Sequence, residues 1–139
     1  MPQLRLDQLS PEMLSPLDLL FDAGETVTLS GPSGSGKSQL LRAIADLDPH
    51  RGTARLDGTA AEEIPAPLWR RRVGYLPAQS YWWRELVAEH FSETPQLEAL
   101  GLKEGIMQAP VEHLSSGERQ RLAVARLLQH SPRALLLDE

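Results

Sequence analysis

The apolar residues of the chain recur in two patterns, one of which predicts short strands. Leu4 and Leu6 alternate with charged residues, which is typical of a short edge strand. β-rich or apolar runs that end in turn residues predict further strands at 17–21, 26–30, 53–56, 73–76 and 134–137. The last of these runs is apolar throughout, so it is expected to be buried.

The second pattern, with apolar residues three or four positions apart, predicts helices. Leu40, Ile44 and Leu47 lie on one helical face, and this helix is expected to end at Asp48-Pro49. The remaining predictions are a helix over 115–130 and irregular, mostly helical structure over about 80–113. Strands and helices in this order predict an α/β fold in one continuous unit.

Composition and charge narrow the class of protein. The 139 residues are 41% hydrophobic and 24% charged, with a formal net charge of -5, which is typical of one modest globular domain. The longest apolar run, 134–137, is far shorter than the ~18 residues that cross a bilayer, and the N-terminus lacks a secretory signal, so a cytosolic location is expected. The absence of cysteine excludes disulfides and thiolate metal sites. The net acidity argues against a nucleic-acid partner.

Residues 31–38 carry the most specific motif of the chain, G-x-x-x-x-G-K-[ST], between a predicted strand and a predicted helix. Three glycines let the backbone turn its N–H groups inward around phosphate oxygens. Lys37 is expected to reach the β- and γ-phosphates, and the Ser38 hydroxyl is expected to bind Mg²⁺. The phosphate-binding candidates are therefore Gly31, Pro32, Ser33, Gly34, Ser35, Gly36, Lys37 and Ser38.

Three later features fit a nucleotide site. Asp138 follows the apolar run 134–137 and is expected to hold Mg²⁺, and Glu139 is expected to polarise the attacking water. Ser115 and Glu118 form an S-x-x-E capping box, so a helix begins there with a second anion site at its positive end.

The stretch 114–121, Leu-Ser-Ser-Gly-Glu-Arg-Gln-Arg, resembles the signature motif of ATP-binding cassette (ABC) proteins. The run 73–79 resembles the strand and glutamine loop of the same family, which implies that Gln79 contacts Mg²⁺ and the attacking water. The resemblance covers the chain from about Leu4 to Glu139. It implies a P-loop NTPase with a RecA-like core and a short helical subdomain, at about 80–118, that carries the signature motif.

The resemblance also implies how such a protein works. Family members hydrolyse ATP as head-to-tail pairs, in which Ser115, Ser116 and Gly117 would complete the partner's site. The resemblance implies a membrane permease as a further partner and a place on the cytoplasmic face of the membrane. The aromatic run 81–83 directly follows Gln79, and two readings stay open: it forms the groove for the permease, or it fills the core of the helical subdomain.

Several positions depart from the family pattern. Ser116 stands where a glycine is usual, and no aromatic lies near 11–14 to stack the adenine, although Met13 offers a softer platform. The strand that ends in the family's switch histidine is absent, so the C-terminal part of the core is expected to be missing and the central sheet to have a gap. None of the four histidines takes that histidine's place, and each is interpreted as a surface or helix-end residue.

The alternatives differ in class. A transporter ATPase is the preferred reading, and a truncated nucleotide-binding fragment without turnover is the main competitor. A soluble ABC ATPase outside transport and a small P-loop kinase are the others.

Overall fold

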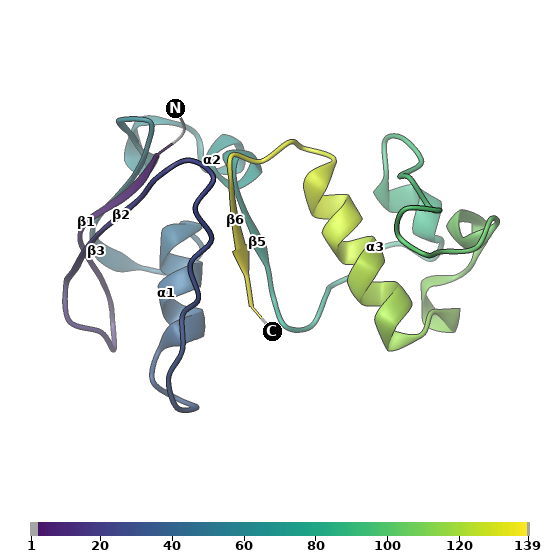
Figure 1. Ribbon diagram of the computed structural model, residues 1–139, viewed down its shortest axis with the longest axis horizontal. Coiled ribbons are helices and arrows are strands. Elements are labelled where there is room, and N and C mark those ends of the chain that lie inside the picture. The colour runs from purple at the N-terminus through teal and green to yellow at the C-terminus, as the bar shows by residue number, and fades with distance from the viewer. Residues whose placement is uncertain (1–2, 139) are drawn as a thin grey trace.

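The computed structural model describes residues 3–138, and an antiparallel sheet forms one side of the molecule (Figure 1). Its strands are β1 (Leu4–Pro11), β2 (Leu17–Phe21), β3 (His50–Leu56) and β4 (Thr59–Ala60), in the order β2-β1-β3-β4. The expectation of an edge strand at Leu4 and Leu6 is wrong, because β1 pairs with β2 on one side and β3 on the other. Both leucines are buried, which explains their alternation with exposed residues.

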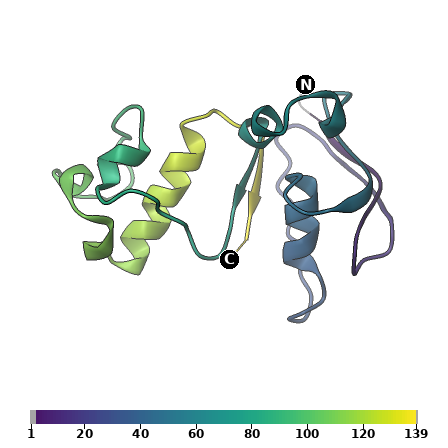
Figure 2. The same cartoon turned by 180° about the vertical axis from the view of Figure 1, so that it is seen from behind.

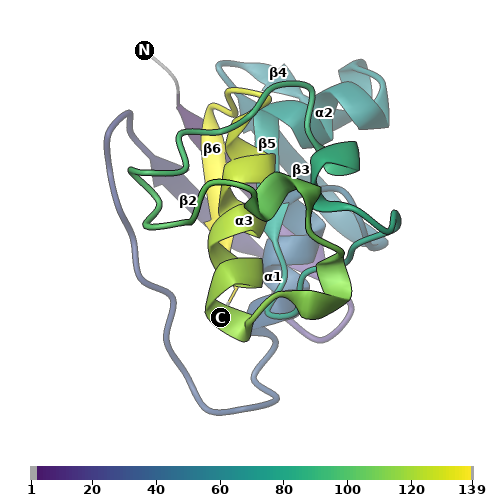
Figure 3. The same cartoon turned by 90° about the vertical axis from the view of Figure 1, so that its right-hand side faces the viewer.

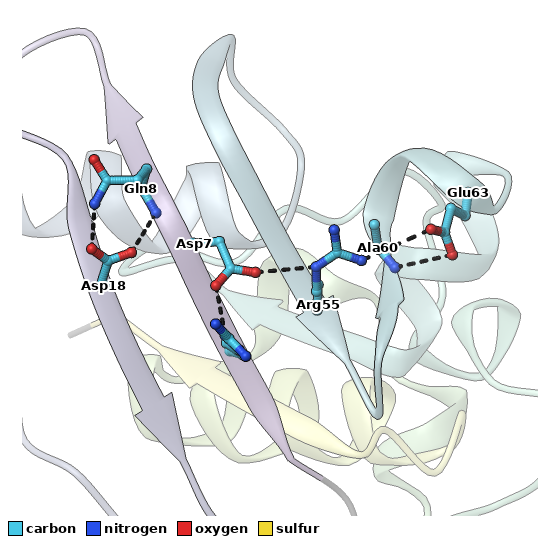
Figure 4. Close-up of polar contacts among 7 residues, drawn as sticks. Asp7, Gln8, Asp18, Arg55, Ala60 and Glu63 are labelled. Atoms are coloured by element: carbon cyan, nitrogen blue, oxygen red, sulfur yellow. Dashed lines mark hydrogen bonds and ion pairs between the residues drawn. The ribbon is translucent and has the colours of Figure 1, made fainter.

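The register of β1 slips near its middle, at Gln8. Gln8 has a φ of +50°, and its N–H donates to the Asp18 carboxylate of β2 at 2.8 Å. The preceding residue, Asp7, accepts from Arg55 of β3 at 3.1 Å (Figure 4). Opposite the slip, a Cβ on Gly52 would lie 2.0 Å from the carbonyl oxygen of Gln8, so the sheet needs a glycine there.

A second sheet consists of two parallel strands, β5 (Val73–Leu76) and β6 (Ala134–Leu137). Figures 1 and 2 show this pair between helix α1 (Lys37–Ile44) and helix α3 (Ser116–Leu128). Helix α3 packs closely on β5, because a Cβ on Gly74 would lie 2.9 Å from Leu127 Cδ1. The short helix α2 (Ala66–Arg72) buries Trp69, whose Nε1 donates to the carbonyl oxygen of Ile44 at 2.9 Å.

Helix α1 ends earlier than its apolar spacing predicts. Asp46 takes a left-handed conformation with a φ of +58°, and the N–H of Leu47 donates back to the carbonyl oxygen of Arg42 at 2.9 Å. This pattern closes the helix after Ile44 and leaves Leu47 38% exposed. The prediction that the helix continues to Asp48-Pro49 is therefore wrong by one turn.

The segment 26–30 is not a strand, contrary to its β-rich sequence. It has no ladder partner among residues 3–138, and Val27 and Leu29 are about half exposed. Figure 3 shows it as an extended loop at the side of the molecule. The prediction of a buried strand at 134–137 is also wrong in part, because β6 pairs only with β5 in the described chain and leaves Leu135 and Leu137 44% and 58% exposed. Among residues 3–138, segment 26–30 and β6 have no strand between them, which is the gap expected in the central sheet.

Between β5 and α3 the chain contains short single-turn 3₁₀ helices rather than the mostly helical structure predicted there. They are η2 (Val87–His90), η3 (Ile106–Gln108) and η4 (Val111–His113), after an earlier one, η1 (Ala61–Glu63). Their apolar residues pack into a buried cluster with Leu122 of α3, separate from the main core. The bounds 80–118 for a helical subdomain stay a prediction.

Among residues 3–138, no helix is both long and apolar enough to span a membrane.

Candidate nucleotide-binding site

The loop 31–36 leads directly into the N-terminal end of α1. Gly34 and Gly36 have φ angles of +78° and +96°, a left-handed conformation that glycine adopts at little cost. Gly36 is the N-cap of α1 and supplies no side-chain hydrogen bond to its first turn. The N–H groups of that turn therefore carry the positive end of the helix dipole without a side-chain cap, which is an environment that binds anions.

Lys37 folds its side chain back over this loop. Its Nζ donates to the carbonyl oxygens of Gly31 at 2.6 Å and Pro32 at 2.9 Å, and to Oγ of Ser35 at 3.3 Å. All three acceptors are uncharged, and an ammonium group makes stronger hydrogen bonds with phosphate oxygens. Lys37 thus lies at the phosphate loop, bound to groups that a phosphate can replace.

The segment after β1 packs against the same loop. A Cβ on Gly36 would lie 2.9 Å from Cδ2 of Leu14, so a larger residue at Gly36 would displace Leu14. The Nε2 of Gln39 lies 3.3 Å from Sδ of Met13, which is 66% exposed. Met13 is therefore beside α1 and open to solvent, and its role as a platform for adenine stays a prediction.

Asp138 directly follows β6, in line with the end of β5. Its N–H donates to the carbonyl oxygen of Leu76 at 2.9 Å, and its Oδ2 accepts from the Tyr75 hydroxyl at 3.2 Å. Gln79 lies in an exposed loop after β5. Glu139 lies outside the described residues, so its role as general base stays a prediction.

The signature stretch forms the capped start of α3, as its sequence predicts. The N–H of Glu118 donates to Oγ of Ser115 at 3.1 Å, and the N–H of Ser115 donates to Oε1 of Glu118 at 2.8 Å. The bond from the N–H of Ser115, together with the Ser115 side chain, holds the pKa of Glu118 below its usual value, because hydrogen bonds to the carboxylate favour its ionised form. Ser115, Ser116 and Gly117 are all exposed, so this helix end is open to another molecule.

The parts of the predicted site lie along one edge of the molecule, but they are not all next to one another. Figure 1 shows the loop before α1, the C-terminal ends of β5 and β6, and the start of α3 all along its lower edge. In Figures 1 and 2, the phosphate loop and the start of α3 lie on opposite sides of the β5–β6 pair. The chain therefore brings the phosphate loop and Asp138 to neighbouring elements and leaves the signature residues apart.

The aromatic run after Gln79 is partly buried and partly exposed. Trp82 packs against the second apolar cluster, whereas Tyr81 and Trp83 are 73% and 56% exposed. The Arg126 guanidinium lies 4.4 Å from the ring centroid of Trp82 and 4.9 Å from that of Trp83. The packing of Trp82 thus supports the core reading for that residue, and the groove for a permease stays a prediction.

His90 lies beneath this run as the last residue of η2, so it is a helix-end residue, one of the two interpretations given to the histidines, and it is buried rather than at the surface. Its Nε2 accepts from the N–H groups of Trp83 at 3.2 Å and Arg84 at 3.0 Å, and Nδ1 lies 3.0 Å from the carbonyl oxygen of Leu86. These backbone partners satisfy both ring nitrogens, which makes burial of the imidazole possible.

Sequence reasoning missed three side chains near the predicted site: His90, Arg126 and Tyr75. The hydrogen-bond partners of the His90 ring lie at most seven positions away in the chain. Arg126 contacts Trp82, 44 positions away, and Tyr75 contacts Asp138, 63 positions away. The only sequence signal for Tyr75 was its place in the strand before Gln79. Within residues 3–138, no group of three or more histidine or acidic side chains is arranged to hold a metal ion alone.

Comparison with known proteins gives a consistent result. The chain matches the family model described as ABC transporter over residues 14–139. It is 38% identical to the aliphatic sulfonates import ATP-binding protein SsuB 2 of Agrobacterium fabrum, over 92% of this chain and 52% of that protein. It is 30% identical to the probable iron export ATP-binding protein FetA of Escherichia coli, over 92% of this chain and 64% of that protein.

The chain therefore spans about half to two thirds of the length of these relatives. Among solved structures, a bacterial Atm1-family ABC exporter with ATP bound matches 99% of this chain and 29% of its own, with a TM-score of 0.81. The sequence identity in that match is 22%, so it supports the fold: a P-loop NTPase core of the ABC ATPase type.

Proposed function

Since the chain belongs to the ABC transporter family, we propose that it is a transporter's ATP-binding subunit, which hydrolyses MgATP as a head-to-tail dimer to power a separate permease. The observation that carries this proposal is the loop 31–36, which ends at an α1 N-terminus without a side-chain cap and is covered by Lys37. Backbone N–H groups of this kind suit the phosphates of a nucleotide, and Lys37 would exchange its carbonyl partners for phosphate oxygens.

The residues near the loop also fit Mg²⁺. This ion prefers hard oxygen ligands and is usually held by one or two carboxylates together with substrate phosphates. The Ser38 hydroxyl, the Gln79 side-chain oxygen and the Asp138 carboxylate offer oxygens of this kind. When bound, Mg²⁺ would neutralise charge on the phosphates, and Glu139 would orient and deprotonate the attacking water.

The signature residues support a dimer. Ser115, Ser116 and Gly117 are exposed at a capped helix start, on the other side of β5 and β6 from the chain's own phosphate loop. A second copy placed head to tail would receive these groups at its own γ-phosphate. Closure of the pair on ATP and opening after hydrolysis would supply the motion that the permease uses.

The aromatic run supports the permease partner. Trp82 lines a hollow of about 480 Å³ together with Arg84, Arg119 and Val111. The Nε of Arg119 is buried there and has no hydrogen-bond partner among the described residues. A cytoplasmic helix of a permease would fill this hollow, which would place the subunit at the cytoplasmic face of the membrane.

A nucleotide-binding fragment without turnover is the second candidate. The segment 26–30 favours it, because this segment leads into the phosphate loop and has no strand partner in the described chain. Phosphate release from ATP separates the two. Steady turnover that Glu139→Gln suppresses, with ATP binding retained, supports the subunit. Binding without turnover in the native chain supports the fragment. If Glu139→Gln loses ATP binding as fully as Lys37→Ala does, the role of Glu139 is contradicted.

The permease contact has a separate test, because Trp82 and Trp83 differ in burial. Trp83→Ala should weaken co-purification with the membrane subunit of the same transporter and leave thermal unfolding nearly unchanged. Trp82→Ala should also lower the unfolding temperature, because Trp82 packs against the second cluster. Unchanged co-purification of a folded Trp83→Ala protein would contradict the docking site.

A further inference from the structure

We propose that Tyr75 is a positioning residue for Asp138: its hydroxyl holds one carboxylate oxygen and so orients the carboxylate that would bind Mg²⁺. The inference rests on the proposed binding of MgATP. It adds a residue on β5, outside the phosphate loop and the signature stretch, to the group that determines metal affinity.

The register of the two strands places these side chains on one face. Tyr75 lies opposite Leu136, and Asp138 follows two residues later, so all three share the same side of the pair. Leu136 is buried and Tyr75 packs half-buried against the main core, which identifies this side as the inner one. From there the long tyrosine side chain reaches diagonally to Asp138, and its hydroxyl donates to Oδ2 at 3.2 Å.

Helix α1 faces the same side. Leu40 and Ile44 of α1 are buried in the same main core that Tyr75 packs against, so α1 covers this side of β5. Ser38 lies in the first turn of α1, directly after the phosphate loop and Lys37. The helix that carries Ser38 thus packs on the side of β5 and β6 that carries Tyr75 and Asp138.

The chemistry of the pair suits a fixed donor. The Tyr75 phenol is an uncharged hydrogen-bond donor to the Asp138 carboxylate. A hydrogen bond from an uncharged donor orients a carboxylate without neutralising it. Metal-binding carboxylates are commonly held by such outer partners, and loss of one costs about 10–100-fold in metal affinity.

The test measures ATP affinity by calorimetry, once with saturating Mg²⁺ and once with EDTA. Tyr75→Phe keeps the ring that packs in the core and removes only the hydroxyl. We expect it to reduce the gain in affinity that Mg²⁺ provides by about tenfold. The affinity in EDTA should stay unchanged, whereas a merely structural role of Tyr75 would lower both affinities alike.

A double-mutant cycle with Asp138→Asn shows whether Tyr75 acts through Asp138. In the Asp138→Asn background, Tyr75→Phe should have no further effect on the Mg²⁺ dependence. An equal effect in both backgrounds, or unchanged Mg²⁺ dependence in Tyr75→Phe alone, would overturn the inference and leave the proposed function intact. A native chain that binds no ATP under either condition would contradict both.

Discussion

Single residues in this chain are constrained most strongly where the backbone turns. Gly52 has a φ of +75°, and a Cβ there would lie 2.0 Å from the carbonyl oxygen of Gln8, within the slip of β1. Gly58 has a similar φ of +84°, but a Cβ there meets nothing within 4 Å. A comparison of substitutions at Gly52 and Gly58 therefore distinguishes the cost of backbone strain from the cost of a steric clash.

Gly52→Ala should therefore destabilise the fold far more than Gly58→Ala. We expect a loss of about 1 kcal/mol at Gly58 from the strained φ alone, and about 3 kcal/mol or more at Gly52, where β1 and β3 must also separate. Urea unfolding of both variants measures the difference. Equal losses would show that β1 and β3 do not pair as described.

The ion pair between α1 and the loop after it gives a pH dependence. Arg42 donates to both oxygens of Asp48, at 2.7 and 3.0 Å, which holds the pKa of Asp48 below its usual value. A lowered carboxyl pKa stabilises the fold above the ordinary Asp pKa, and this contribution disappears as the pH falls through the folded-state pKa.

Asp48→Asn should consequently reduce the free energy of unfolding at pH 7, by less than about 1 kcal/mol because both side chains are about one third or more exposed. The difference from the native chain should vanish near pH 2. Denaturant titrations at the two pH values measure it. A difference that persists at low pH would show that the charge of Asp48 is not its cause.

For helices and strands, local sequence patterns predict where an element lies, but they do not predict which distant segments pair with one another. The sequence predicts β2 and β5 with the bounds observed, and the capping box of α3 in full, because each depends on residues close together in the chain. It fails at 26–30, because a β-rich run becomes a strand only beside another strand. The Tyr75–Asp138 contact likewise joins residues 63 positions apart, which no local pattern reveals.

The cap of α3 has a matched control in the next residue. Ser115→Ala removes the oxygen that accepts from the N–H of Glu118 and should cost about 1 kcal/mol of stability. Ser116→Ala removes an exposed hydroxyl at the first helical position and should change stability by less than about 0.5 kcal/mol. Thermal unfolding compares them, and equal effects would contradict the capping box.

At the scale of the whole molecule, the two sheets differ in how completely they pair. β1 has a neighbour on both sides, whereas 26–30 has none and β6 has one in the described residues. An extended segment without partners leaves its N–H groups open to water, and local stability follows such differences.

Hydrogen exchange should therefore divide the chain into two groups of amides. The amides of β1 should be the slowest to exchange, and those of 26–30 should exchange about as fast as loops. Mass spectrometry of peptides from the isolated chain measures both. Protection of 26–30 equal to that of β1 would show that this segment has a strand partner in solution.

We expect residues 31–38 to form a working phosphate site in this chain. The most direct measurement is an equilibrium titration of the purified 139-residue chain with ATP and Mg²⁺, alongside Lys37→Ala and Lys103→Ala, which change the chain's two lysines one at a time. We predict binding by the native chain and by Lys103→Ala, and none by Lys37→Ala. Absence of ATP binding in all three proteins, or equal binding in all three, would show that residues 31–38 do not bind the nucleotide through Lys37.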